Sequence, residues 1–337
     1  FRSRTLYSDD MGESWQSINL YGEKNISLIW TDSEGKLFIA GCSGEANSPD
    51  GVTRGHTLYC STDGLKSFVP LTAPDPVKYE NSSYYGFVPQ RITSDSRYIY
   101  ITFASSGEVF FGGMGAYACD TGSLSGGKVY RYRIENGVPV FDTDITPEDD
   151  TSCGYSGICS NGKMLLLSTV CRKNGGDMIY TSTDSGESWK IIMNGLEYSR
   201  FDWNIPYMKP QYNGGGNCVH WISDIKLSPF DSDTALFNTG TGLFMITGLA
   251  SGNVLVKPFC EGIEETVHLN VYTTPHGRNR IIDIIGDLGG FAFKNYDSEC
   301  ENSFANENGD RYITCLNADL TLSEPEYIVA TPRGNWT

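Results

Sequence analysis

Short runs of apolar residues, several of them alternating with polar ones, recur along the chain, and no long stretch has the apolar spacing of an amphipathic helix. The runs are rich in Tyr, Ile, Leu and Phe and are bounded by Gly, Asn, Ser and Asp. This is the pattern of short β-strands separated by turns. Four such runs lie at residues 36–40, 97–103, 128–132 and 163–167. The pattern predicts an all-β fold.

Two eight-residue segments, at residues 8–15 and 182–189, both read S-x-D-x-G-x-S-W. Between them along the chain, an eroded second copy lies at 61–68 and ends in Phe68. In this motif, the Asp-box, the Asp and Ser side chains bind turn amides, the Gly takes a positive φ and the aromatic residue closes the hairpin. The segments therefore predict strand–turn–strand units in which the Asp residues are structural.

The spacing of the copies predicts the architecture. They begin at residues 8, 61 and 182, so the second interval is more than twice the first and indicates one repeat that lacks the motif. A repeat of roughly 60 residues matches one four-stranded blade of a β-propeller. No proline-rich or low-complexity linker interrupts the 337 residues, so we expect blades throughout.

The net charge of −16 argues against nucleic acids and anionic membranes as partners, because both would repel the protein. A neutral polymer such as a plant polysaccharide is compatible with this charge. No apolar run approaches the roughly 18 residues of a membrane helix. The chain opens at Phe1 without an initiator Met or a signal peptide, so we expect it to be a piece of a longer protein.

Ten cysteines without a C-x-x-C pair make a structural zinc site improbable, and we expect no metal or cofactor. Either several cysteines form disulfides in an exported protein, or most are small buried residues. Glycosylation sequons begin at Asn25, Asn81 and Asn335. Cysteines and sequons together favour a secreted, glycosylated protein.

Residues 219–294 carry an ordered series of motifs. They read V-H-W at 219–221, S-P-F-D-S-D at 228–233, G-T-G at 240–242, G-I-E-E-T at 262–266 and G-D-L-G-G-F at 286–291. Together with the Asp-boxes, this series resembles glycoside hydrolase family 74, the endo-xyloglucanases and related β-1,4-glucanases. The resemblance covers essentially the whole chain.

The resemblance implies two seven-bladed propellers that face each other across an open cleft, and hydrolysis with inversion by two Asp residues, one from each propeller. By its position in the motif, Asp287 matches the residue that protonates the leaving oxygen. Gly286, Gly289 and Gly290 around it would let the backbone bend tightly and let a sugar approach. We therefore expect Asp287 to be the general acid and Gly289 and Gly290 to contact substrate.

The second carboxylate of the family lies in a T-D-x-G-G loop, which is absent from residues 1–337. Inversion needs two carboxyl groups roughly 6.5–9.5 Å apart. We expect the general base to precede Phe1, unless the protein has lost it and only binds. On this interpretation the chain is most of the first propeller, with residues 320–337 leading into a following blade.

Sugar-binding clefts use flat aromatic side chains, because their faces pack against the C–H side of a sugar ring. The candidates are Trp203, Tyr207, Trp221 and Tyr155. The family carries an Asp in its R-Y-x-x-D segment, and this chain has Asn204 there, which predicts an altered subsite or a substrate other than xyloglucan.

Two other functions remain open. A sialidase shares Asp-boxes but needs an arginine cluster and an F/Y-R-I-P segment, which the start of the chain lacks. A non-catalytic, sortilin-like binding propeller accounts for the Asp-boxes, cysteines and sequons but gives no reason for the G-D-L-G-G segment. The sequence therefore favours a secreted, monomeric glucanase that acts on cell-wall polysaccharide.

Overall fold

The computed structural model of the chain shows an all-β protein, as predicted. In its described part, no helix is long and apolar enough to cross a bilayer. The described residues are 5–18, 26–42, 58–71, 87–105, 126–148, 153–170, 172, 176–195, 200–203, 205, 219, 221–240, 242–263, 266–300, 303–309, 312–321, 323 and 327–333.

The chain divides into two compact units, although its composition shows no boundary. The N-terminal unit comprises residues 1–197, 219–240 and 245–255, and the C-terminal unit comprises 198–218, 241–244 and 256–337. The chain passes between the two units more than once, and the expectation of blades along the whole chain stays a prediction.

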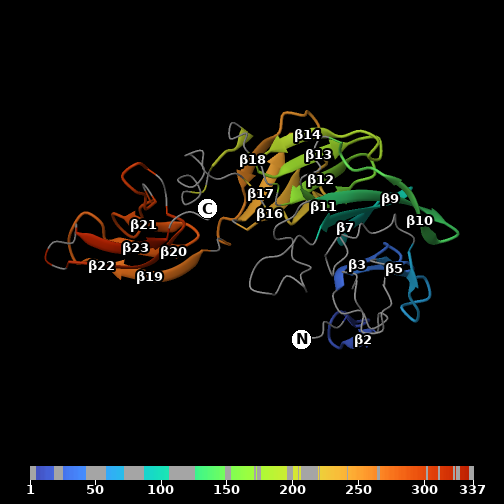
Figure 1. Ribbon diagram of the computed structural model, residues 1–337, viewed down its shortest axis with the longest axis horizontal. Helices are drawn as coiled ribbons and strands as arrows, with labels where there is room; N and C mark the ends of the chain where they lie inside the picture. Colours follow the sequence, from blue (N-terminus) through green and yellow to red (C-terminus); the bar gives the residue numbers. More distant parts are fainter. Residues whose placement is uncertain are drawn as a thin grey trace, which may run out of the picture. The chain divides into compact units, whose positions relative to one another are not determined.

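Four-stranded sheets, in which the strand order follows the sequence, account for most of the described strands (Figure 1). The first sheet, of two strands, pairs β1 (Thr5–Tyr7) with β2 (Gln16–Ile18). The second sheet contains β3 (Ile26–Thr31), β4 (Phe38–Cys42), β5 (Leu58–Ser61) and β6 (Val69–Pro70). The third contains β7 (Phe87–Ser94), β8 (Tyr98–Ser105), β9 (Gly127–Glu135) and β10 (Val138–Asp144).

The fourth sheet contains β11 (Gly154–Ser160), β12 (Leu165–Val170), β13 (Met178–Ser182) and β14 (Lys190–Asn194). The fifth contains β15 (Asp224–Leu227), β16 (Ala235–Thr239), β17 (Gly242–Thr247) and β18 (Leu255–Pro258). The four predicted runs coincide with parts of β4, β8, β9 and β12.

In the N-terminal unit, the first strand of each sheet lies beside the first strand of the next, so that β7 contacts β3 and β11, and β11 contacts β15. Glycines permit this approach. A Cβ added at Gly157 of β11 would lie 2.5 Å from the amide nitrogen of Ile225, and one at Gly41 would lie 2.8 Å from Cβ of Pro89. These distances are shorter than van der Waals contact, so neither position accepts a side chain without movement.

The inner sheets bury both faces. On β8, Ile99 and Ile101 belong to a cluster shared with Leu28 and Leu58 of the preceding sheet. Tyr100, which points the opposite way, belongs to a cluster shared with residues of the following sheet. This two-sided burial explains why residues 97–103 read as a nearly continuous apolar run.

The Asp-boxes close hairpins that connect β1 to β2, β5 to β6 and β13 to β14, and their hydrogen bonds confirm the predicted turn chemistry. In the third copy, the Gly186 N–H donates to Ser182 Oγ (2.8 Å) and the Ser188 N–H donates to Asp184 Oδ1 (3.0 Å). Ser185 and Gly186 both have positive φ, at 63° and 87°. The first and third copies therefore place the glycine in the second of two left-handed positions.

The eroded copy keeps the same backbone with different residues. Here Gly64 occupies the first left-handed position (φ 74°) and Leu65 the second (φ 67°). The repeat that lacks the motif is the sheet β7–β10, where Asn136 and Gly137 connect β9 to β10 with φ of 53° and 80°. An Asn-Gly turn of this kind matches the twist of a hairpin and takes the place of the Asp-box.

The C-terminal unit contains β19 (Val267–Thr273), β20 (Ile281–Gly286), β21 (Gly289–Phe293), β22 (Thr314–Leu320) and β23 (Ile328–Arg333), drawn in orange and red in Figure 1. The strands β19, β20 and β21 are antiparallel, as are β22 and β23. A parallel pairing of Gly289 with Thr314 joins the two groups. Ile282 and Ile284 of β20 pack with Cys315 and Ala318 of β22 to form the core.

Cys60, Cys159 and Cys315 are buried free thiols, which matches the second of the two alternatives left open by the cysteine count for these three residues. Burial raises the pKa of all three, that of Cys159 to about 12, so they are unreactive at neutral pH. Cys153 and Cys260 are also buried. The sequons at Asn25, Asn81 and Asn335 lie outside the described residues.

Replacing Trp189 should destabilise the protein more than replacing Trp15, its equivalent in the first Asp-box. The Trp189 indole donates to the Ile145 carbonyl (2.7 Å) and packs on Tyr180, whereas Trp15 is 60% exposed and donates only to Gly12 within its own turn. We expect Trp189→Phe to lower the free energy of unfolding by about 1 kcal/mol, and Trp15→Phe by less than about 0.5 kcal/mol. Chemical denaturation compares them, and equal losses would contradict this assignment.

The Asp-box carboxylates should contribute to stability in a defined pH range. Hydrogen bonds from the hydroxyl and amide of Ser188 lower the pKa of Asp184 to about 2, below its unfolded value of about 3.9. This contribution is complete above about pH 4 and is lost as the pH falls through about 2. Asp184→Asn should therefore be less stable than the wild type at pH 7, and the difference should shrink between pH 4 and 2. A constant difference in denaturation midpoints would refute this.

Candidate functional site

Asp287 lies in the turn that connects β20 to β21, where Ile285 pairs with Gly289. Its backbone is left-handed, with φ of 62°. Its N–H donates to Thr314 Oγ1 (3.1 Å), and the Gly289 N–H donates to the Ile313 carbonyl (2.8 Å). The Asp287 side chain is exposed, and its carboxylate has no hydrogen-bond or ion-pair partner among the described residues. The turn thus combines a fixed backbone with an unengaged carboxyl group.

Gly289 and Gly290 have a packing role in this turn. A Cβ at Gly289, whose φ is +78°, would lie 2.4 Å from the Tyr312 carbonyl oxygen. A Cβ at Gly290 would lie 2.7 Å from the Asp283 carbonyl oxygen and 3.0 Å from the Phe304 ring. Both glycines therefore allow the hairpin to rest directly on neighbouring segments. Contact with substrate at these two positions stays a prediction.

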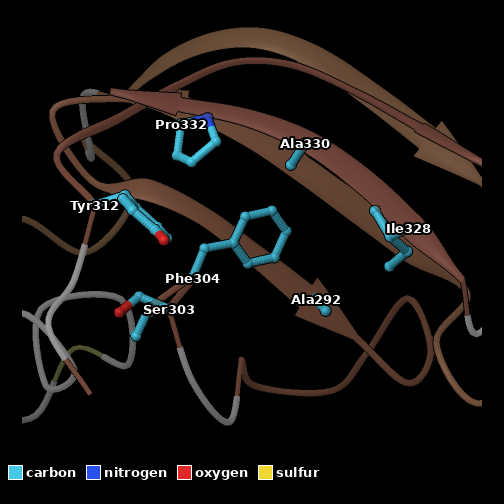
Figure 2. Close-up of a pocket in the computed structure, with 8 residues that line it drawn as sticks. Ala292, Ser303, Phe304, Tyr312, Ile328, Ala330 and Pro332 are labelled. Atoms are coloured by element: carbon cyan, nitrogen blue, oxygen red, sulfur yellow. The ribbon is translucent and has the colours of Figure 1, made fainter. Parts of the chain in front are cut away.

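The segments under the hairpin also line a cavity of about 420 Å³. Figure 2 shows the Phe304 ring in the middle of this cavity, between Tyr312 and Ile328. The lining residues are Ala292, Ser303, Phe304, Ala305, Tyr312, Ile328, Ala330 and Pro332. The described residues of the lining are mostly apolar and include no carboxylate or imidazole.

A hydrogen-bonded chain on β19 and β20 was missed in the sequence. Asp283, which is 8% exposed, lies 2.9 Å from Nδ1 of His268, and His268 Nε2 lies 2.6 Å from Thr266 Oγ1. Asp283 is on β20 and Asp287 is in the turn after it. His268 pairs with Ile285, which lies between these two residues. The signal was a single charged residue inside the apolar run I-I-D-I-I, which marks a paired carboxylate.

Among the predicted sugar-binding aromatic residues that the structure describes, Trp221 is the most accessible, at 50% exposure. Its φ of 60° is unusual for a bulky residue, and its neighbours hold it in place. The Ile222 N–H donates to Asp177 Oδ2 (3.1 Å), and Ser156 Oγ donates to the Ile222 carbonyl (2.5 Å). Asp177 is itself fully buried. The backbone next to the exposed indole is therefore held by buried residues of the N-terminal unit.

The other predicted aromatic residues differ in their surroundings. Tyr155 is fully buried in the core with Tyr100 and Tyr180, so its proposed sugar-stacking role is wrong, because no ring face is accessible. Trp203 stacks on Phe201 with ring centroids 4.9 Å apart, which covers one face of its indole. Tyr207 and Asn204 lie outside the described residues.

Within the described ranges, no three His, Cys, Asp or Glu side chains are grouped so as to hold a metal ion. Asp287 is the candidate whose carboxyl group is both exposed and carried on a fixed backbone.

Known proteins match this chain over nearly its whole length. A xyloglucanase from a Paenibacillus species is 20% identical over 98% of this chain and 33% of the relative. An oligoxyloglucan-reducing end-specific xyloglucanase from Emericella nidulans is 22% identical over 87% of this chain and 41% of the relative. No family model matches the chain.

The crystal structure of a xyloglucanase of glycoside hydrolase family 74 from Xanthomonas campestris matches with a TM-score of 0.70 at 18% identity, over 98% of this chain and 42% of that one. An ancestral enzyme of the same family matches with a TM-score of 0.64 at 13% identity. The resemblance to glycoside hydrolase family 74 is confirmed. The fold is the β-propeller of these enzymes, built from the blades described above.

The chain spans about a third to two-fifths of the length of the two xyloglucanase relatives. Their activities belong to the longer proteins. The arrangement of two seven-bladed propellers, the role of Asp287 and the position of the general base stay predictions.

Adding a methyl group at Gly289 should disrupt the Asp287 turn more than the same change at Gly309. Both glycines have positive φ, but a Cβ at Gly309 meets open space, whereas at Gly289 it meets a backbone oxygen. Gly309→Ala should therefore report only the left-handed backbone cost of about 1 kcal/mol. We expect Gly289→Ala to lose at least about 2 kcal/mol more in the free energy of unfolding. Similar losses in a denaturation experiment would show that the contact with Tyr312 is not tight.

Proposed function

We propose that the full-length protein is a glycoside hydrolase that cleaves the β-1,4-glucan backbone of xyloglucan, with Asp287 as general acid. The observation that carries this proposal is the exposed Asp287 carboxyl group on a hydrogen-bonded turn within the G-D-L-G-G-F motif. The whole-length match to family 74 xyloglucanases supports the substrate class.

In the proposed reaction, protonated Asp287 gives its proton to the glycosidic oxygen as the bond between that oxygen and the anomeric carbon breaks. A water molecule attacks the anomeric carbon from the opposite face and loses a proton to a general base, so that the configuration inverts. We place the base outside residues 1–337, because these residues lack the T-D-x-G-G loop.

Trp221 is the proposed residue for stacking on a sugar, since its indole is exposed and the backbone next to it is held by buried neighbours. An exposed aromatic face can pack against the C–H side of a pyranose ring. Trp203 and the unplaced Tyr207 and Asn204 remain candidates for further contacts.

We propose endo cleavage, a monomeric state and secretion. The named relatives include a xyloglucanase and a reducing end-specific one, so the mode of attack needs its own measurement. An extracellular location suits a protein that acts on cell-wall polymer, and the net charge of −16 does not hinder its approach to a neutral substrate.

Replacing Asp287 should abolish hydrolysis and leave the fold intact. We expect Asp287→Asn in the full-length protein to lower kcat on xyloglucan by about 10²- to 10⁴-fold, because an amide cannot donate the proton. Asp297→Asn is the matched control, since Asp297 is also an exposed turn residue of the C-terminal unit. Both variants should retain the wild-type thermal midpoint within a few degrees.

Reducing-sugar release measures the rate, and proton NMR of the fresh product shows the anomeric configuration. Wild-type activity in Asp287→Asn would remove Asp287 from the chemistry. An inactive wild type that still binds xyloglucan would favour the non-catalytic binding propeller instead.

A further inference from the structure

We propose that Thr314, the first residue of β22, is a positioning residue for Asp287. This inference rests on the proposed role of Asp287 as general acid. It names a residue that lies 27 positions away in the sequence and reaches Asp287 through a backbone hydrogen bond.

The backbone of Asp287 needs an external support. A non-glycine residue in the left-handed region costs roughly 1–2 kcal/mol relative to ordinary conformations. Such a residue keeps that conformation when its surroundings fix it. Because the Asp287 carboxylate binds no described residue, the support comes from the backbone and not from the side chain.

Two hydrogen bonds to the segment before and at the start of β22 supply that support. Thr314 Oγ1 accepts the Asp287 N–H, and the Ile313 carbonyl accepts the Gly289 N–H. They lie on either side of Leu288 and so fix both ends of the turn. Gly289 also pairs directly with Thr314 as a neighbouring strand residue, and a Cβ added to it would lie 2.4 Å from the Tyr312 carbonyl oxygen.

Thr314 is well suited to hold an amide in a constant place. It is 8% exposed, and a β-branched side chain has few accessible χ1 rotamers. The hydroxyl position is therefore set by the β22 backbone, which is itself paired with Arg333 of β23. Leaving the Asp287 N–H without its acceptor would favour a change in φ, and this would redirect the Cα–Cβ bond that carries the carboxyl group.

Redirecting the Cα–Cβ bond of Asp287 should lower the rate of the chemical step more than it weakens substrate binding. A displacement of about 1 Å of a reacting group can cost about 10²-fold in rate. Contacts with the rest of the polysaccharide do not pass through Asp287, so the Michaelis constant should respond little. Loss of kcat at nearly constant KM is the expected signature of a positioning residue.

The test uses Thr314→Val, which keeps the shape and removes the acceptor, and Thr314→Ser, which keeps the acceptor. Thr331→Val is the matched control, since Thr331 Oγ1 donates to the Asn317 carbonyl elsewhere in the same unit. On xyloglucan, we expect Thr314→Val to lower kcat by about 10- to 100-fold with KM within about twofold of wild type. Thr314→Ser should stay within about threefold, and Thr331→Val should match the wild type.

A double variant separates positioning from general damage. Because the two residues act as one unit, Asp287→Asn with Thr314→Val should be no slower than Asp287→Asn alone. If the thermal midpoint shows that Thr314→Val misfolds, Thr314→Ala takes its place in the same comparison. Wild-type kcat in a folded Thr314→Val or Thr314→Ala variant would overturn the proposal, as would multiplicative losses in the double variant.

An inactive wild type would refute the proposed function instead. In that case, amide hydrogen exchange at Asp287 still tests the anchor, because it needs no substrate. We expect faster exchange of this amide in Thr314→Val than in the wild type and no change in Thr331→Val. Equal protection in all three proteins would overturn the positioning role.

Discussion

The constraint on which this structure depends is the close approach of neighbouring segments at glycine. At Gly41, Gly157 and Gly289 an added Cβ would meet atoms of another segment at 2.4–2.8 Å. Gly41 lets β4 approach β7 and Gly157 lets β11 approach β15 in the N-terminal unit, and Gly289 brings the Asp287 hairpin against Tyr312. Glycines at close approaches thus allow the sheets to pack and also support the turn that carries Asp287. A side chain at any of these positions would separate backbones whose spacing the adjacent core residues require.

Hydrogen bonds within the turns stabilise single hairpins, and side-chain packing stabilises the contacts between sheets. An Asp-box satisfies its own amides through Ser and Asp side chains, so it closes a hairpin with little help from outside. An Asn-Gly pair does the same between β9 and β10 with only backbone geometry. Contacts beyond the turn distinguish the copies, because Trp189 reaches Ile145 of the preceding sheet, whereas Trp15 remains exposed. Turn chemistry is therefore local, and the connection between sheets is tertiary.

The sequence was informative where structure follows from neighbouring residues. Alternation, turn residues and the Asp-box repeat predicted the strands and their connections, including the place of the repeat without the motif. It was uninformative where residues distant in sequence decide the outcome. Tyr155 is of a residue type that often stacks on sugars, and its burial becomes evident only from the packing of its sheet against the preceding one. Thr314 is an ordinary strand residue until β22 places its hydroxyl next to the Asp287 amide.

The central claim is that the Asp287 turn presents a carboxyl group to a glycosidic oxygen of xyloglucan. The most direct measurement is a crystal structure of the full-length Asp287→Asn protein with a xyloglucan oligosaccharide that spans the scissile bond. We predict that the side chain of residue 287 lies within about 2.6–3.2 Å of a glycosidic oxygen. An oligosaccharide bound with all its glycosidic oxygens away from residue 287 would contradict the account.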